Sequence, residues 1–146
     1  MKPILVSACL LGAACKYSGG DNLCPKVAAL TEKYHLVPVC PEQLGGLPTP
    51  RTPAERQGDR VITRDGSDVT DAYLRGAQEA LKLAKFFGCD TAILKVRSPS
   101  CGVGAIYDGT FTGTVIPGSG VTAALLEASG IRVITEEELD RLLELN

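Results

Sequence analysis

Residues 3–15, PILVSACLLGAAC, are the feature that most restricts how this chain can fold. The segment is either the apolar core of a secretory signal, or a buried first strand that ends close to Cys9. Ser7, Cys9 and Gly12 interrupt the apolar run, and Pro3 stands where a helical signal would begin. We therefore expect a buried strand in a cytoplasmic protein, whose six cysteines serve a metal or catalysis rather than disulfides.

Apolar runs of strand length alternate with amphipathic segments of helix length along the 146 residues. This alternation predicts an α/β fold in which right-handed crossovers join parallel strands. We expect a single domain over residues 1–146, built as a three-layer Rossmann-like parallel sheet with a small hairpin insertion. The expected strands are 4–8, 35–40, 91–96 and 131–135, and the expected helices are 24–34, 69–87, 120–130 and 136–145.

Turn-forming residues punctuate this pattern in three places. Residues 45–68 are rich in Gly and Pro and predict a loop with a small hairpin within 59–67. Residues 104–116 predict a short hairpin that turns at Asp108 and Gly109. PGSG at 117–120 opens a helix at the edge of the sheet that ligands use, which makes its N-terminus a candidate anion site.

Composition argues against several classes of partner. The formal charge is −2 and no run of Lys or Arg stands out, which disfavours nucleic acid and anionic membrane surfaces. No stretch reaches the ~18 consecutive apolar residues of a membrane span. The glycine motifs that bind nucleotide phosphates are missing from the sequence. His35 is the only histidine and begins a strand at the opposite edge, so we exclude Ser–His and Cys–His dyads.

Three of the cysteines each follow an expected strand: Cys9 the first, Cys40 the second and Cys101 the third. The carboxyl ends of parallel strands lie at one edge of a sheet, where ligands bind at the switch point. A single cysteine often only fills a core, but three at strand ends indicate a shared site. Three sulfurs with one open position suit a catalytic metal or a cluster better than structural zinc, which takes four protein ligands.

The other three cysteines have weaker assignments. Cys89 ends the long helix and is expected in the core. Cys15 and Cys24 lie in the loop after the first strand, and no regular C-x-x-C spacing ties them to zinc.

Polar side chains accompany the cysteines at strand ends. Glu42 lies two residues after Cys40, where a carboxylate beside a metal can act as a general acid or base, or can simply begin a helix. Ser98 and Ser100 stand close to Cys101, and either hydroxyl can donate to a sulfur, to substrate or to the turn. The candidate walls of a substrate pocket are Lys16, Tyr17, Arg51 and Ser100.

Four ordered motifs resemble a family of iron–sulfur-dependent thiouracil desulfidases, formerly a domain of unknown function. The motifs are SACLLG with KYSGG, VPVCPEQLGGLPTPR, DVTDAYLRGA and ILKVRSPSCG, and they span essentially the whole chain. The resemblance implies a [4Fe-4S] cluster held by Cys9, Cys40 and Cys101. One iron without a protein ligand would then bind the sulfur of a thiocarbonyl substrate, such as 2-thiouracil or a related thiolated base.

The resemblance also implies roles in the reaction. Glu42 matches the acid/base glutamate, which activates water to attack the carbon of the C–S bond. Ser98 matches the serine that positions substrate or relays a proton, with Ser100 as the alternative. The oxo product and hydrogen sulfide leave without net redox change.

Two alternative functions, neither of them a desulfidase, remain open at this point. One is a non-catalytic zinc-binding or redox-sensing module, in which Cys15 or Cys24 supplies a fourth sulfur and Glu42 has no role. The other is a carrier of sulfur or of a cluster to a partner enzyme. The sequence also leaves the oligomeric state undefined.

Overall fold

A four-stranded parallel sheet with the order β2-β1-β5-β8 forms the centre of the protein. The computed structural model describes the backbone of residues 1–145 and the side chains of residues 1–142. The first apolar run forms β1, a central strand of the sheet, which confirms the strand prediction. Cys9 therefore follows the end of a central strand. The strands are β1 (Lys2–Ser7), β2 (Tyr34–Val39), β5 (Thr91–Leu94) and β8 (Arg132–Thr135).

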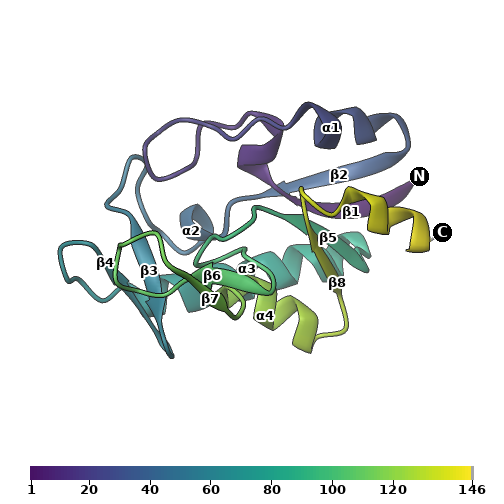
Figure 1. Cartoon of the computed structure of the whole chain (residues 1–146). Helices are drawn as coiled ribbons and strands as arrows, with labels where there is room; N and C mark the ends of the chain where they lie inside the picture. The colour runs from purple at the N-terminus through teal and green to yellow at the C-terminus, as the bar shows by residue number, and fades with distance from the viewer. Residues whose placement is uncertain (146) are drawn as a thin grey trace.

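Helices cover both faces of this sheet (Figure 1). On one face, Leu5 and Leu94 pack with residues of α3 (Thr70–Phe87) and α4 (Val121–Ala128). On the other face, Ile4 and Val6 pack against Leu10, Val27 and their neighbours. Successive strand residues point to opposite faces, so the apolar run of β1 fills both cores. The second layer holds α1 (Pro25–Ala28) and the 3-10 turns η1 (Ala8–Leu11), η2 (Ala29–Glu32) and η3 (Leu139–Leu145). The predicted three-layer α/β fold is confirmed.

The long helix α3 follows from its apolar spacing. Tyr73, Ala77, Ala80 and Ala84 recur every three or four residues and are all buried. The helix ends at Gly88, whose φ of 72° is the left-handed conformation that glycine adopts without strain. Its observed range agrees with the predicted helix over 69–87.

Other elements are shorter than predicted. The helix expected over 24–34 breaks into α1 and η2, and the Thr31 hydroxyl donates back to the Ala28 carbonyl near that break. The strand expected over 91–96 ends at Leu94, because Lys95 N–H donates to Ser7 Oγ instead of continuing the ladder. The helix expected over 136–145 is the 3-10 turn η3.

Two small antiparallel hairpins extend beyond the carboxyl edge of the sheet (Figure 1). The first joins β3 (Ala54–Gln57) and β4 (Arg60–Thr63), and it turns at Gly58, outside the predicted range 59–67. The second joins β6 (Ala105–Tyr107) and β7 (Val115–Pro117).

The turn of the second hairpin is wider than the predicted turn at Asp108 and Gly109. Glu55 Oε1 of β3 accepts hydrogen bonds from the N–H groups of Gly109 (3.0 Å) and Phe111 (3.1 Å). These contacts tie the connecting loop 108–114 to the first hairpin and open the turn. The two hairpins therefore form one wall beyond the strand ends.

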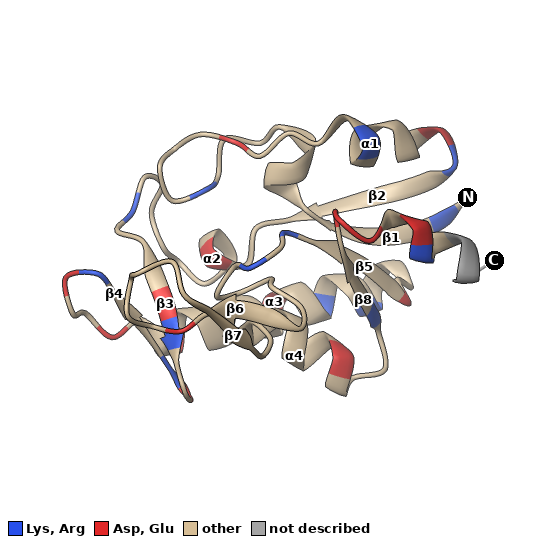
Figure 2. Cartoon of the chain, viewed as in Figure 1, with Lys and Arg blue, Asp and Glu red and all other residues tan. Residues whose placement is uncertain are grey.

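Charged residues of both signs are interspersed along the ribbon (Figure 2). No helix in the described part of the chain is long and apolar enough to cross a membrane.

Candidate functional site

A cavity of about 430 Å³ lies at the carboxyl edge of the sheet, between the strand ends and the two hairpins. The chain passes from β1 to β2 on one side and resumes at β5 on the other, so the switch point lies between β1 and β5. Ser7 at the end of β1 and Lys95 after β5 both line the cavity, as does Val39 at the end of β2. The cavity therefore occupies the position that the strand order predicts for a ligand.

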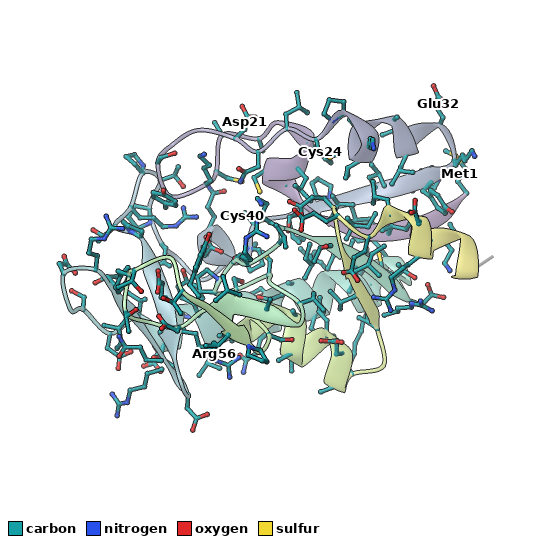
Figure 3. The ribbon with its side chains drawn as sticks, viewed as in Figure 1. Met1, Asp21, Cys24, Glu32, Cys40 and Arg56 are labelled. Carbon is teal, nitrogen blue, oxygen red and sulfur yellow. The ribbon has the colours of Figure 1, made fainter. Side chains whose placement is uncertain are left out.

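Cys9, Cys40 and Cys101 all line this cavity. Cys9 lies in η1 directly after β1, and Cys40 stands between β2 and the short helix α2 (Pro41–Leu44). Figure 3 labels Cys40 beside α2. Cys101 lies in the turn after β5 and is 4% exposed. Three thiols distant in sequence thus meet at one end of the sheet, as their positions after strands predict.

The turn that presents Cys101 is held by Ser98. Ser98 Oγ accepts hydrogen bonds from the N–H groups of Ser100 and Cys101, both at 3.1 Å. The Ser98 carbonyl accepts from Gly102 N–H at 2.8 Å. Ser98 also lines the cavity, so its hydroxyl proton is free to point toward a ligand.

Ser100 has a different environment from Ser98. It is 0% exposed, does not line the cavity, and forms a 2.8 Å hydroxyl contact with Thr122 of α4. The structure therefore disagrees with Ser100 as a pocket wall and places Ser98 alone of the two serines in the cavity.

The N-terminus of α4 is not a free anion site either. The N–H groups of Thr122 and Ala123 donate to the Ser100 carbonyl, at 2.8 and 3.1 Å. Gly120 allows this approach, because a Cβ on it would lie 2.4 Å from that carbonyl group. The helix terminus that was a candidate anion site caps the Cys101 turn instead.

Close contact between two glycines positions Glu42. A Cβ on Gly76 of α3 would lie 1.8 Å from the Pro41 carbonyl oxygen, and one on Gly45 would lie 2.0 Å from the Ala72 carbonyl oxygen. Only glycine allows the backbones of α2 and α3 to approach so closely. Glu42 is in the first turn of α2 and lines the cavity.

Arg51 binds the Glu42 carboxylate directly, with Nη2 at 2.5 Å from Oε2. The same nitrogen donates to the Cys15 carbonyl at 2.9 Å, while Nη1 donates to Thr49 Oγ1 at 3.0 Å and to the Pro48 carbonyl at 3.3 Å. The Arg51 side chain is 6% exposed. Burial acts to lower the pKa of the guanidinium, but the Glu42 carboxylate outweighs it and the pKa is raised. Arg51 lines the cavity as predicted, and both of its terminal nitrogens donate to protein groups.

Burial raises the pKa of the Cys9 and Cys101 thiols. Cys15 also lines the cavity, and burial together with the neighbouring Cys40 raises its pKa to about 12. The Cys40 thiol points toward the Cys15 carbonyl, 3.7 Å away. Neutral thiols of this kind become thiolate ligands when a bound metal stabilises the charge.

The remaining cysteines lie outside the cavity lining. Cys89 is buried in the core against α3 and α4 residues, as predicted. Cys24 is labelled beside α1 in Figure 3, where it packs on the other apolar core.

The structure adds residues that the sequence did not single out. Tyr73 of α3 lines the cavity and is 4% exposed, and burial with the nearby Glu42 raises the pKa of its phenol. Lys95 lines the cavity next to Cys9, and its Nζ lies 2.9 Å from Glu136 Oε2. The sequence gives little indication of a functional role for either residue. Tyr73 has the spacing of a buried helix face, and Lys95 stands at the end of an apolar strand. Lys16 and Tyr17 line the cavity from the loop after η1.

Thiols are the cavity's candidate ligands, since Cys9, Cys40 and Cys101 all line it. Iron–sulfur clusters are held by cysteine thiolates, so these donors fit a cluster in their chemistry. Within the described residues no group of three or more His, Cys, Asp or Glu side chains is arranged to hold a single metal ion.

Comparison with known proteins agrees with this geometry. A family model described as 2-thiouracil desulfurase matches residues 4–138. This chain belongs to the 2-thiouracil desulfurase family. The match extends from β1 to the end of the sheet, and it confirms the resemblance that the four motifs indicated.

Two relatives of this desulfurase family cover nearly the whole chain. An uncharacterized Bacillus subtilis protein, YbbK, is 47% identical over 150 residues, which covers 96% of this chain and 99% of YbbK. The solved structure of the [4Fe-4S]-dependent thiouracil desulfidase TudS has a TM-score of 0.93 and 46% identity. That match covers 99% of this chain and 97% of the TudS chain. The similarity therefore extends to the elements that form the cavity.

Proposed function

We propose that this protein removes sulfur from a small thiocarbonyl compound, 2-thiouracil or a related thiolated base. The observation that carries the proposal is the cavity in which three thiols meet Glu42 and Ser98 at the switch point of the sheet. Family membership and the likeness to TudS support the same reaction class.

Cys9, Cys40 and Cys101 would hold a [4Fe-4S] cluster, leaving one iron without a protein ligand. When bound, such a cluster supplies a Lewis acid for the substrate sulfur. The thiol donors and their shared place in the lining of one cavity support this assignment. The remaining chemistry belongs to side chains of the chain.

Glu42 acts on water in this proposal. Arg51 holds Oε2, and Oε1 carries no hydrogen bond within the described residues, so Oε1 can accept a proton from a water molecule. Ser98 keeps its hydroxyl proton for the substrate, because its oxygen already accepts two backbone N–H groups. Water exchanges with the thiocarbonyl compound to give the oxo compound and hydrogen sulfide. Atoms and electrons balance in this exchange, so no external reductant is needed.

The partner in this proposal is a small molecule, with no role for nucleic acid or membrane. We place the protein in the cytoplasm, because that reducing compartment keeps free cysteines available for a cluster.

The test is an anaerobic assay of the protein reconstituted with iron and sulfide. Wild type incubated with 2-thiouracil should release uracil and hydrogen sulfide in equal amounts. Glu42→Ala and the isosteric Glu42→Gln should keep the iron content and absorption spectrum of wild type but lose turnover. Normal activity in either variant would show that the role of Glu42 is wrong. A loaded wild type that releases no sulfide would instead favour a carrier of sulfur or of a cluster.

A further inference from the structure

Tyr73 is a deeply buried polar side chain that the proposed chemistry does not use. It lies in the first turn of α3, is 4% exposed and lines the cavity. Within the described residues its hydroxyl forms no side-chain hydrogen bond, and its oxygen is not among the fully buried polar atoms without a partner, so the hydroxyl opens onto the cavity. A phenol on a buried ring whose hydroxyl opens onto a cavity can donate its proton to a molecule bound there.

The phenol shares one cavity with the proposed reacting groups. Tyr73 lines it together with Glu42, Arg51, Cys40 and Cys101. The close packing of α3 on α2 explains this placement, because Tyr73 follows Ala72, whose carbonyl meets Gly45 of α2. The phenol therefore lies in the same cavity as the Glu42 carboxylate and two of the proposed cluster ligands.

The chemistry of the group defines what it can do. A phenol is protonated at neutral pH and is a donor of one hydrogen bond. Glu42 Oε2 is already held by Arg51, and the other tyrosines of the cavity, Tyr17 and Tyr107, are more exposed than Tyr73. A neutral donor that is held in a helix at the wall of the cavity suits recognition of a carbonyl or ring nitrogen.

We propose that Tyr73 is a substrate-binding residue of this site, whose phenol donates a hydrogen bond to an acceptor atom of the thiolated ring. This contact orients the ring so that its C–S carbon faces the water activated by Glu42. Ser98 and Tyr73 then donate from different elements, the Cys101 turn and α3. The identity of the ring rests on the proposed function, whereas the role of the phenol as a ligand donor rests on the place of Tyr73 in the cavity wall.

The test compares Tyr73→Phe with wild type in the cluster-loaded protein. Tyr34→Phe is the matched control, because Tyr34 begins β2 at the opposite end of the sheet. Turnover of 2-thiouracil gives kcat and KM, and calorimetry gives the dissociation constants of 2-thiouracil and of uracil. Iron content and the melting temperature complete the comparison.

We expect Tyr73→Phe to bind uracil about 3- to 10-fold more weakly and to lower kcat/KM by at least the same factor. Iron content should not change. The melting temperature should change little, because the hydroxyl makes no side-chain hydrogen bond within the described residues and opens onto the cavity. A purely structural hydroxyl would lower the melting temperature and leave the uracil affinity unchanged, and that result would overturn the proposal.

The outcomes separate this proposal from the proposed function. An active wild type with an equally active and equally tight-binding Tyr73→Phe overturns only the role of Tyr73. A wild type that binds 2-thiouracil without turnover, and a variant that binds it more weakly, supports Tyr73 and contradicts the desulfidase reaction. A wild type that neither binds nor converts 2-thiouracil overturns both.

Discussion

Arg51 Nη2 lies 2.5 Å from Glu42 Oε2 and 2.9 Å from the Cys15 carbonyl oxygen, so one guanidinium nitrogen joins α2 to the loop after η1. Both charged side chains are largely shielded from water, with 6% and 16% exposure. Buried ion pairs of this kind fix geometry more reliably than they add stability. The pair holds the carboxylate of Glu42 in one orientation at the cavity.

Replacing Arg51 should therefore affect turnover more than substrate affinity. Arg51→Lys keeps the charge but loses the planar set of donors, and we expect kcat to fall about 10- to 100-fold with a small change in KM. Arg51→Ala should lower kcat further than Arg51→Lys, because it leaves the Glu42 carboxylate without its charged partner. Steady-state kinetics on protein with a matched iron content provides the measurement.

Arg60→Ala is the control for this prediction, since the Arg60–Asp68 pair is exposed and Arg60 does not line the cavity. It should retain wild-type kinetics. Equal kcat values for Arg51→Lys and wild type would show that Glu42 does not need Arg51 for its orientation.

Gly76→Ala tests how α3 positions the site. Its Cβ would lie 1.8 Å from the Pro41 carbonyl oxygen, so α2 must move away from α3. We expect a loss of about 1–3 kcal/mol in the free energy of unfolding and weaker desulfidase activity, because Cys40 and Glu42 move with α2. Urea unfolding measures the loss of stability.

Gly20→Ala is the control, since the nearest atom to its Cβ would be a flexible Lys16 carbon at 3.4 Å. Equal losses in the free energy of unfolding of Gly76→Ala and Gly20→Ala would show that the close contact between α2 and α3 is not needed.

Ser98 and Ser100 should give different results when each is replaced by alanine. Ser98→Ala removes a cavity hydroxyl and the acceptor for two N–H groups, so kcat should fall about 100-fold. Ser100→Ala breaks the buried contact with Thr122 and should cost about 1–2 kcal/mol of stability, with a smaller effect on kcat. Ser98→Thr keeps the hydroxyl and should restore part of the activity. A larger kcat loss in Ser100→Ala than in Ser98→Ala would assign the active serine to Ser100.

The cluster-free protein should lose stability at alkaline pH. Burial raises the pKa of the Cys9 and Cys101 thiols in the folded state, whereas an unfolded thiol has a pKa of about 8.5. Below this value both states keep their protons and the folded state has its full stability. As the pH rises above about 8.5, unfolded thiols ionise first, so the free energy of unfolding falls.

Melting temperatures of the cluster-free protein from pH 7 to pH 10 measure this effect. The slope in Cys101→Ala should be shallower than in wild type, because one of the buried thiols is gone. A melting temperature that stays constant or rises with pH would contradict the assigned direction.

Local patterns in the sequence were enough to predict the sheet and the three thiols. Cys9, Cys40 and Cys101 each follow a run of apolar residues, and the rule for parallel strands brings such positions together without knowledge of the loops. The apolar spacing of α3 likewise predicts its range, because one face of the helix must pack on the sheet.

Contacts between loops could not be predicted in the same way. The ion pair of Arg51 and Glu42 depends on the path of residues 45–51, and the turn of the second hairpin depends on Glu55, which is distant in sequence. Tyr73 looked like an ordinary core residue, since spacing gives burial but not the place of a hydroxyl in a cavity wall. The sequence did not predict β3 within the Gly- and Pro-rich stretch 45–68. This strand forms by pairing with β4 and by contact with the second hairpin, and local composition does not indicate such contacts.

Iron analysis after anaerobic reconstitution tests the central claim most directly. Wild type should hold about four irons per chain with the broad visible absorption of a [4Fe-4S] cluster, and Cys9→Ala, Cys40→Ala and Cys101→Ala should each lose both. Cys15→Ala is the matched control within the same cavity and should keep the cluster. Tight zinc binding without stable iron, or a wild-type iron content in any of the three variants, would contradict the proposed cluster site.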